Sequence, residues 1–330
     1  MEATLALLIL VIILSYIYAF VGGFTDAANA IATSIGTRAL SPVTAVLMAG
    51  FLELAGALTG TAVALTIGKG IVSLELITLA TVVAALLATM CWSLFTYYFG
   101  IPVSETHGLI GGVLGAALAT AGTKAVLWDG LNKVLIAIVA SPLLGFLGGA
   151  IFISIIYFFF HKGSNKKMNG IFTNLQRLSA AFMAFSHGRN DAQKPMGVLV
   201  MALALYFGWK DPQVPLWVIL SVGLTAGLGV AYGGWRIIRT LGTKITPLTT
   251  AQGFSAETSA ALVLQLASQF GIPVSTTHTI TSAIVGAGAA RRVSSVRWGI
   301  VQDIVLSWVF TLPVTIILGW IFASVFQFLF

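Results

Sequence analysis

The chain has 330 residues, of which 58% are hydrophobic and only 8% are charged, and its mean hydropathy is +0.99. A soluble globular domain carries typically about 25% charged residues, so the composition excludes that class and indicates a protein that lies mostly within a lipid bilayer. The net charge of +7 does not predict nucleic-acid binding, because no basic run is interleaved with aromatic residues. The single cysteine, Cys91, excludes an internal disulfide.

In chain order the sequence contains ten apolar blocks, and a helix that crosses a membrane needs about 20 such residues. The first block follows Met1 without a basic segment, so we predict a retained span and not a cleaved signal peptide. Two long blocks contain Pro142 and Pro313, and each is predicted to fold as two shorter pieces. The blocks lie near 3–22, 41–67, 76–99, 108–121, 134–160, 180–207, 214–237, 252–270, 278–290 and 299–328.

One clearly aqueous and basic stretch, 161–177, separates the two halves of the chain. Cytoplasmic loops of membrane proteins carry an excess of Lys and Arg, so this stretch is predicted to be cytoplasmic. If the ten blocks alternate across the membrane, the N-terminus lies outside. The other basic residues fit this choice: Arg38, Arg236, Arg239, Lys244, Arg291, Arg292 and Arg297 fall inside, whereas only Lys69, Lys124, Lys133 and Lys210 fall outside.

Two pairs of similar phrases indicate an internal repeat. Gly-Ile-Pro-Val-Ser-Glu-Thr-His at 100–107 matches Gly-Ile-Pro-Val-Ser-Thr-Thr-His at 271–278, and a second match aligns Asp26 with Asp191. The pairs occur in the same order at a similar separation. Five blocks in each half, starting from opposite sides, form an inverted-topology repeat with broken helices or re-entrant hairpins. The predicted units are 1–160 and 178–330, joined by the basic loop 161–177.

Acidic side chains are unusually frequent for apolar sequence. A central aspartate costs about 2.5–3.5 kcal/mol on the membrane-insertion scale, so these groups must be neutralised. The few intramembrane cations, Arg189 and Lys194, cannot serve all of them, which leaves protons or bound metal cations for most. The acidic residues are Asp26, Glu53, Glu105, Asp191, Glu257 and Asp303, of which Asp303 is the weakest candidate for a functional role.

Asp26 and Asp191 are predicted ligands of sodium. Amide and hydroxyl oxygens stand near each of them, as hard cations prefer, and backbone carbonyls at Gly22-Gly23 and Gly188 could add ligands where a helix unwinds. The alternative is a structural salt bridge from Asp191 to Arg189 or Lys194. The repeat keeps the aspartate and changes its cationic neighbours, which favours the cation site. The full predicted sodium set is Asp26, Asn29, Asn190 and Asp191.

The repeated Pro-Val-Ser phrases are predicted to form an anion site. Ser and Thr at the start of a helix are preferred N-caps, so plain capping is the simpler interpretation. The same geometry presents free N–H groups and the positive end of the helix dipole to an anion. The predicted anion-binding residues are Ser104, Glu105, Thr106, Ser275, Thr276 and Thr277, with Asn29 and Gln193, and His107 and His278 are weaker candidates.

Together these motifs resemble the inorganic phosphate transporter (PiT) family, although Phe24-Thr25 departs from its usual residue-Asn pair before Asp26. The resemblance covers both halves. It implies cation-driven phosphate symport, an inverted repeat of about a dozen membrane segments, and a homodimer. The transport-critical aspartates of the family fall on Asp26 and Asp191, and its critical glutamates fall on Glu53 and Glu257.

The sequence therefore predicts an all-α polytopic membrane protein that couples inorganic phosphate to sodium across the cell (inner) membrane, with a sodium ion at each aspartate. Expected partners are phosphate, sodium, the lipid bilayer and a second copy of the chain, with no organic cofactor and no nucleic acid. The alternative is a proton-coupled permease for phosphate or sulfate, in which Glu53 or Glu257 carries the proton. An anion channel is disfavoured because it needs no buried acidic cation sites. An intramembrane enzyme built on Ser104 and His107 is disfavoured because both residues lie in a capping phrase that recurs.

Overall fold

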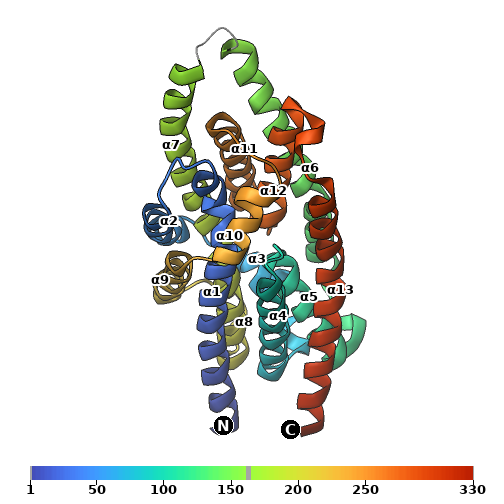
Figure 1. The fold of residues 1–330 in the computed structure, drawn as a ribbon. Helices are drawn as coiled ribbons and strands as arrows, with labels where there is room; N and C mark the ends of the chain where they lie inside the picture. The colour runs from blue at the N-terminus through green and yellow to red at the C-terminus, as the bar shows by residue number, and fades with distance from the viewer. Residues whose placement is uncertain (1, 161–164, 330) are drawn as a thin grey trace.

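The computed structural model describes residues 2–160 and 165–329, and within them the chain is helical and contains no strand (Figure 1). Residues 161–164, at the centre of the predicted basic loop, lie outside the described part. The helices are α1 (Glu2–Gly36), α2 (Pro42–Ala57), α3 (Ala62–Gly70), α4 (Leu79–Phe99), α5 (Glu105–Ala121), α6 (Trp128–Phe160), α7 (Asn165–Asp191), α8 (Gln193–Phe207), α9 (Leu216–Tyr232), α10 (Trp235–Arg239), α11 (Thr250–Gln269), α12 (Thr276–Arg291) and α13 (Trp298–Leu329).

The two halves contain similar elements in the same order. Each has a bent helix pair, α2 with α3 at 68° and α9 with α10 at 56°, followed by a helical hairpin and a final long helix. In Figure 1, α1 and α6 run from the lower end to the upper end, whereas α7 and α13 run the opposite way. These opposed directions are what an inverted repeat requires, and the repeat itself stays a prediction.

Five of the described helices are long and apolar enough to cross a membrane, and the number is seven if each bent pair is one span. This finding agrees with a multi-pass membrane protein. The predicted figure of about a dozen segments is not reached by this criterion. Much of the predicted loop 161–177 is helical, because α7 begins at Asn165.

The predicted break at each proline is wrong, because α6 and α13 continue through Pro142 and Pro313. A proline removes one helical hydrogen bond, and these two helices are long enough to tolerate that loss. The breaks occur instead within the blocks 41–67 and 214–237, which we predicted as single elements. The second break contains Gly233, whose φ of 82° is accessible to glycine with little strain.

The two Pro-Val-Ser phrases are extended turns within helical hairpins, as predicted. α4 and α11 end near Gly100 and Gly271, which have φ values of 69° and 65°. The next residues are extended, and then α5 and α12 begin. A left-handed glycine followed by a proline cannot continue a helix, so the sequence itself sets these breaks.

Small residues bring the two halves into close contact. A methyl group added at Gly115 of α5 would lie 1.9 Å from the carbonyl oxygen of Ile316 in α13. In the other half, a methyl group at Gly286 of α12 would lie 2.1 Å from the carbonyl oxygen of Phe146 in α6. Each short hairpin helix therefore packs against the last long helix of the other half.

Candidate functional site

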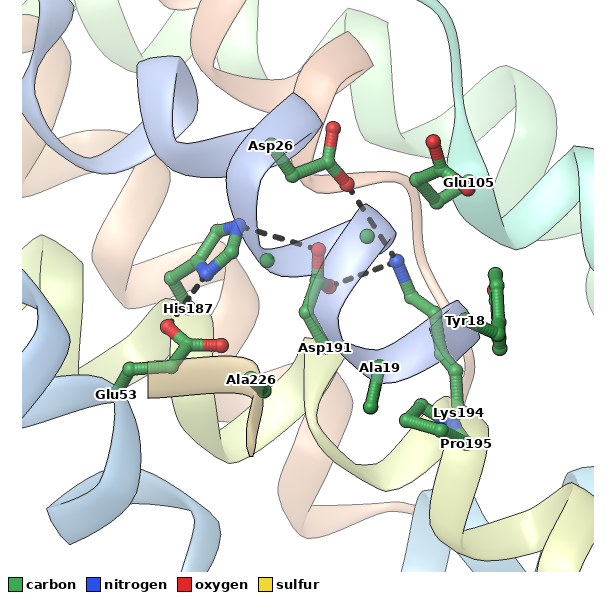
Figure 2. Close-up of a pocket in the computed structure, with 12 residues that line it drawn as sticks. Tyr18, Ala19, Asp26, Glu53, Glu105, His187, Asp191, Lys194, Pro195 and Ala226 are labelled. Carbon is green, nitrogen blue, oxygen red and sulfur yellow. Dashed lines mark hydrogen bonds and ion pairs between the residues drawn. The ribbon is translucent and has the colours of Figure 1, made fainter. Parts of the chain in front are cut away.

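A buried cavity of about 20 Å³ lies where α1, α2, α5, α7, α8 and α9 meet (Figure 2). Both predicted aspartates line it, together with two of the other predicted acidic residues, although their positions in the sequence are far apart. The lining consists of Tyr18, Ala19, Gly22, Gly23, Asp26, Glu53, Glu105, His187, Asp191, Lys194, Pro195 and Ala226. The motifs of the two halves therefore meet at one place, as an inverted repeat predicts.

The helix α1 continues through Gly22 and Gly23, and Gly188 lies inside α7, so the expected unwinding at these glycines is wrong. The glycines serve close packing. A methyl group at Gly23 would lie 2.3 Å from the carbonyl oxygen of Ala226, and one at Gly188 would lie 2.1 Å from that of Glu53. Only Ala192 separates α7 from α8, and its backbone stays in the right-handed helical region, with its N–H bonded to the carbonyl oxygen of Gly188.

Asp191 is held by three groups, all from the second half of the chain. Its Oδ1 lies 3.0 Å from Nζ of Lys194, and its Oδ2 accepts a hydrogen bond of 2.9 Å from the hydroxyl of Thr276. The Nε2 atom of His187 lies 3.2 Å from the same Oδ2. The salt bridge with Lys194, which the sequence left open as an alternative, is therefore present, and both oxygens of Asp191 are engaged.

Asp26 is less fully engaged than Asp191. Its Oδ1 accepts a hydrogen bond of 3.3 Å from Thr277, whereas its Oδ2 lies 4.0 Å from Nζ of Lys194, beyond hydrogen-bond distance. One turn further along α1, the amide nitrogen of Asn29 donates to the hydroxyls of Thr276 and Thr277. The buried oxygens Asp26 Oδ2 and Asn29 Oδ1 have no hydrogen-bond partner among the described residues. Such buried oxygens without a donor are suitable ligands for a hard cation.

Glu53, His187 and Asp191 form a chain of buried ionisable groups. His187 Nδ1 lies 2.7 Å from Glu53 Oε2, and its other ring nitrogen faces Asp191 (Figure 2). The side chains of Glu53 and His187 are 1% and 0% exposed, so water does not screen this pair. Glu53 is thus paired with a histidine that the sequence reasoning missed. The spacing of His187 and Asp191, one helical turn apart, was the available signal.

Glu105 approaches the cavity from the first hairpin. Its two oxygens accept hydrogen bonds of 3.0 Å from Thr25 and 2.8 Å from Ser93. The cavity thus contains four carboxylates, from Asp26, Glu53, Glu105 and Asp191, beside the ammonium group of Lys194 and the imidazole of His187. If all four carboxylates are ionised, the cluster is negative even with His187 protonated, and further positive charge has to balance it.

Tyr18 also lines the cavity and was not predicted. Its side chain is 2% exposed, and its hydroxyl has no hydrogen-bond partner in residues 2–160 and 165–329. It lies beside Lys194 in Figure 2. The two groups offer an O–H and an ammonium donor to whatever occupies the cavity.

The serines of both hairpins cap their helices. Ser104 Oγ accepts a hydrogen bond of 3.2 Å from the backbone N–H of His107, and Ser275 Oγ accepts one of 3.1 Å from that of His278. The hairpins also contact each other, because the hydroxyl of Thr106 donates to the carbonyl oxygen of Val274. The helix starts of α5 and α12 therefore face the same region from the two halves.

His107 and His278 do not line the cavity, but their rings are in contact, with centroids 4.6 Å apart. The ring of His278 also stacks on Trp308 at 3.9 Å. These contacts place both histidines at the junction of the two hairpins. They agree with the interpretation that neither is a primary ligand.

Other predicted residues lie away from the cavity lining. Gln193 accepts a hydrogen bond from the backbone N–H of Ala64, near the start of α3, and donates to the carbonyl oxygen of Arg189. The guanidinium of Arg189 bonds the amides of Gln265 and Gln269 and is not paired with an acidic side chain in the described part of the chain. Asn190 contacts Ser268.

Glu257 occupies a second buried polar cluster. Its carboxylate accepts hydrogen bonds from Thr33, Gln176 and Ser179, which come from α1 and α7. Thr33 lies about two turns beyond Asp26 on α1, so Glu257 is not in the cavity. Asp303 is also outside it, on α13. The predicted acidic residues therefore do not form one site.

The arrangement can bind a cation and an anion side by side. One donor atom each from Asp26, His187 and Asp191 lies within 4.8 Å of the others, which is close enough for a shared ion. The N-terminus of α12 adjoins the same aspartates through Thr276 and Thr277, and its dipole favours negative charge. The ammonium group of Lys194 lies 3.0 Å from Asp191 and 4.0 Å from Asp26.

Comparison with known proteins supports this description. Residues 22–319 match the model of the phosphate transporter family. The chain is 44% identical to a "probable low-affinity inorganic phosphate transporter" of Rhizobium meliloti over 95% of each chain. It is 41% identical to a protein of the same name from Bacillus subtilis over 97% of each. A solved structure titled "The sodium-dependent phosphate transporter" matches with a TM-score of 0.92 and 28% identity, covering 98% of this chain and 100% of that one.

Proposed function

Because this chain belongs to the phosphate transporter family, we propose that it moves inorganic phosphate across the cell membrane by symport with sodium. Phosphate transport itself agrees with the predicted resemblance, and the relatives are named as transporters and not as enzymes. The choice of sodium as the driving ion, the membrane in question and the direction of transport are parts of the proposal.

The observation that carries the proposal is the excess of carboxylates in the buried cavity. Four carboxylates face one lysine and one histidine, and a phosphate anion would add more negative charge. An anion enters such a site only if cations enter with it. Binding of the cation and of phosphate then strengthen each other by the same factor, which is the thermodynamic basis of symport.

Sodium is placed at the first half of the site. The unpaired oxygens of Asp26 and Asn29 supply hard ligands there, and the solved neighbour is named as sodium-dependent. At the second half, the ammonium group of Lys194 already lies 3.0 Å from Asp191. We therefore revise the predicted pair of sodium ions to one ion, bound near Asp26.

Phosphate is placed at the facing starts of α5 and α12. The first N–H groups of a helix lack intrahelical partners and bind anions well. Ser104, Ser275, Thr276 and Thr277 surround these helix starts. Lys194 supplies a positive charge on the cavity side. The amide of Gln193 is engaged with α3, so we leave it out of the phosphate site.

Uptake of labelled phosphate into proteoliposomes tests the function directly. The purified protein should accumulate phosphate when a sodium gradient is imposed at equal pH on both sides, and should accumulate little when a pH gradient is imposed without sodium. Protein-free liposomes are the control. Accumulation that follows the pH gradient and ignores sodium would reject sodium symport and leave phosphate transport intact.

Proton-coupled symport is the second candidate, and the chain Glu53–His187–Asp191 favours it. His187 Nδ1 is hydrogen-bonded to Glu53 at 2.7 Å, which is suitable for passing a proton, and its Nε2 lies 3.2 Å from Asp191. In that case Glu53→Gln should remove the pH dependence of uptake. Glu257, held by three neutral donors outside the cavity, is less suitable for this role than Glu53.

Serine substitutions test the anion site. In Ser104→Ala and Ser275→Ala, loss of a hydrogen bond to a charged ligand should weaken phosphate binding by roughly 1.5–3 kcal/mol. The loss of an N-cap should cost only about 1 kcal/mol of stability. Binding is measured by calorimetry in detergent, and stability by thermal unfolding. Ser41→Ala, which removes the cap of α2 away from the site, is the matched control. If all three variants are less stable but bind phosphate with unchanged affinity, the two serines cap their helices and do not bind phosphate.

Labelling of introduced cysteines tests the orientation. In a Cys91→Ala background, cysteines at Lys166 and Arg291 should react only from the cytoplasmic side, and one at Lys124 only from outside. The opposed directions of α6 and α7 support this expectation (Figure 1). Labelling of positions 124 and 166 from the same face would contradict the inverted repeat. The homodimer also stays a proposal that follows from the family resemblance.

A further inference from the structure

The two halves of the site differ at one equivalent position. Alignment of Asp26 with Asp191 places Asn29 opposite Lys194, each three residues after its aspartate. Both side chains are buried, at 1% and 2% exposure. The first half therefore presents an amide oxygen where the second half presents a positive charge.

The environments of the two aspartates differ accordingly. In the first half, Asp26 Oδ2 and Asn29 Oδ1 have no hydrogen-bond partner among the described side chains and backbone. In the second half, Asp191 Oδ1 lies 3.0 Å from the ammonium group of Lys194, while its Oδ2 is engaged by Thr276 and His187. The first half has oxygen atoms that are free to bind a cation. The second half already contains a cation, the ammonium group of Lys194.

A sodium ion and a lysine ammonium group carry the same charge, and in a buried site each repels the other strongly. A sodium ion at Asp191 would have to displace Lys194, which is almost fully buried and lies between the two aspartates (Figure 2). The lysine neutralises Asp191 and lies 4.0 Å from Asp26, so it acts on both halves of the cavity.

We infer that Lys194 is a tethered counter-cation that replaces one co-transported sodium ion at Asp191. The inference rests on the proposed sodium symport and deepens it. An amide at position 194 would open a second cation site like that of Asp26 and Asn29. The wild-type protein thus moves phosphate with one sodium ion fewer than a variant in which the ammonium group is removed.

The number of coupled sodium ions follows from the ratio of internal to external phosphate concentration at which net phosphate flux is zero. Proteoliposomes are prepared with wild-type protein or with Lys194→Asn, the membrane potential is clamped at zero, and a sodium gradient of about tenfold is imposed. Each additional sodium ion multiplies the phosphate ratio at zero flux by the sodium ratio, so Lys194→Asn should raise it by about tenfold. Lys194→Arg keeps the charge and should keep the wild-type ratio.

Asn29→Lys provides the reciprocal test and does not depend on the folding of Lys194→Asn. A lysine in the first half should replace the sodium ion there, so the zero-flux ratio should fall by about tenfold and no longer follow sodium. An unchanged ratio in Lys194→Asn, or in Asn29→Lys if the former does not fold, would overturn the role of Lys194 and leave sodium symport standing. A wild-type ratio that ignores sodium would overturn both proposals.

Discussion

Replacing Asp26 by asparagine should nearly abolish sodium-driven phosphate uptake while leaving the folded protein at least as stable in the absence of sodium. The side chain is 4% exposed, and its Oδ2 has no hydrogen-bond partner in the described chain. Removing its charge therefore removes a desolvation cost from the empty site. It also removes a charged ligand worth about 1.5–3 kcal/mol, so half-maximal uptake should require about 10- to 150-fold more sodium.

Sodium titrations of phosphate uptake at fixed pH measure this effect, with thermal unfolding in sodium-free buffer beside them. Asp211→Asn is the matched control, because Asp211 pairs with Lys69 at the surface and its side chain is 78% exposed. The control should keep the wild-type sodium dependence. If Asp26→Asn and Asp211→Asn reach half-maximal phosphate uptake at the same sodium concentration, Asp26 is not a sodium ligand.

Replacing His187 by alanine should have the largest effect on stability. Glu53 would be left buried without its partner, and breaking a buried ion pair from one side costs about 3–5 kcal/mol. Typical net stabilities are about 5–15 kcal/mol, so this loss is a large fraction of the whole. The double variant Glu53→Gln with His187→Ala removes both charges and should recover part of the loss. Thermal unfolding of the wild type, both single variants and the double variant gives the coupling energy.

Additive effects of the two substitutions on the free energy of unfolding would contradict this prediction. If the destabilisation in the double variant equals the sum of the two single effects, Glu53 and His187 do not act as a pair. Because His187 also faces Asp191 at 3.2 Å, Asp191→Asn is the comparison variant. It keeps the Glu53–His187 pair but removes the partner of Lys194, so it should also destabilise the protein, and Glu53→Gln should not recover that loss.

The parts of the fold that could be predicted are those with a strong local signal. The Pro-Val-Ser phrases combine a left-handed glycine with a proline, and both hairpins form where they occur. The matched aspartates were also predictable, because a carboxylate in apolar sequence is costly and the repeat aligns Asp26 with Asp191. Their meeting in one cavity follows from the repeat.

The features that the sequence left open or missed depend on which face of a helix a residue occupies. Lys194 is three residues after Asp191 and lies on the same helical face, whereas Arg189 is two residues before it and points elsewhere. His187 lies one turn before Asp191, but its partner Glu53 comes from α2, and that contact depends on tertiary packing. The bends in the α2–α3 and α9–α10 pairs have no proline to mark them.

The central claim is that phosphate and sodium bind together at the buried carboxylate cluster. It is tested most directly by phosphate affinity in detergent, measured by calorimetry over a range of sodium concentrations at fixed pH. The account predicts that phosphate binding strengthens steeply with sodium and that Asp26→Asn makes this dependence shallower. Phosphate binding that is indifferent to sodium and strengthens as the pH falls, in a manner lost in Glu53→Gln, would contradict the account and establish proton coupling instead.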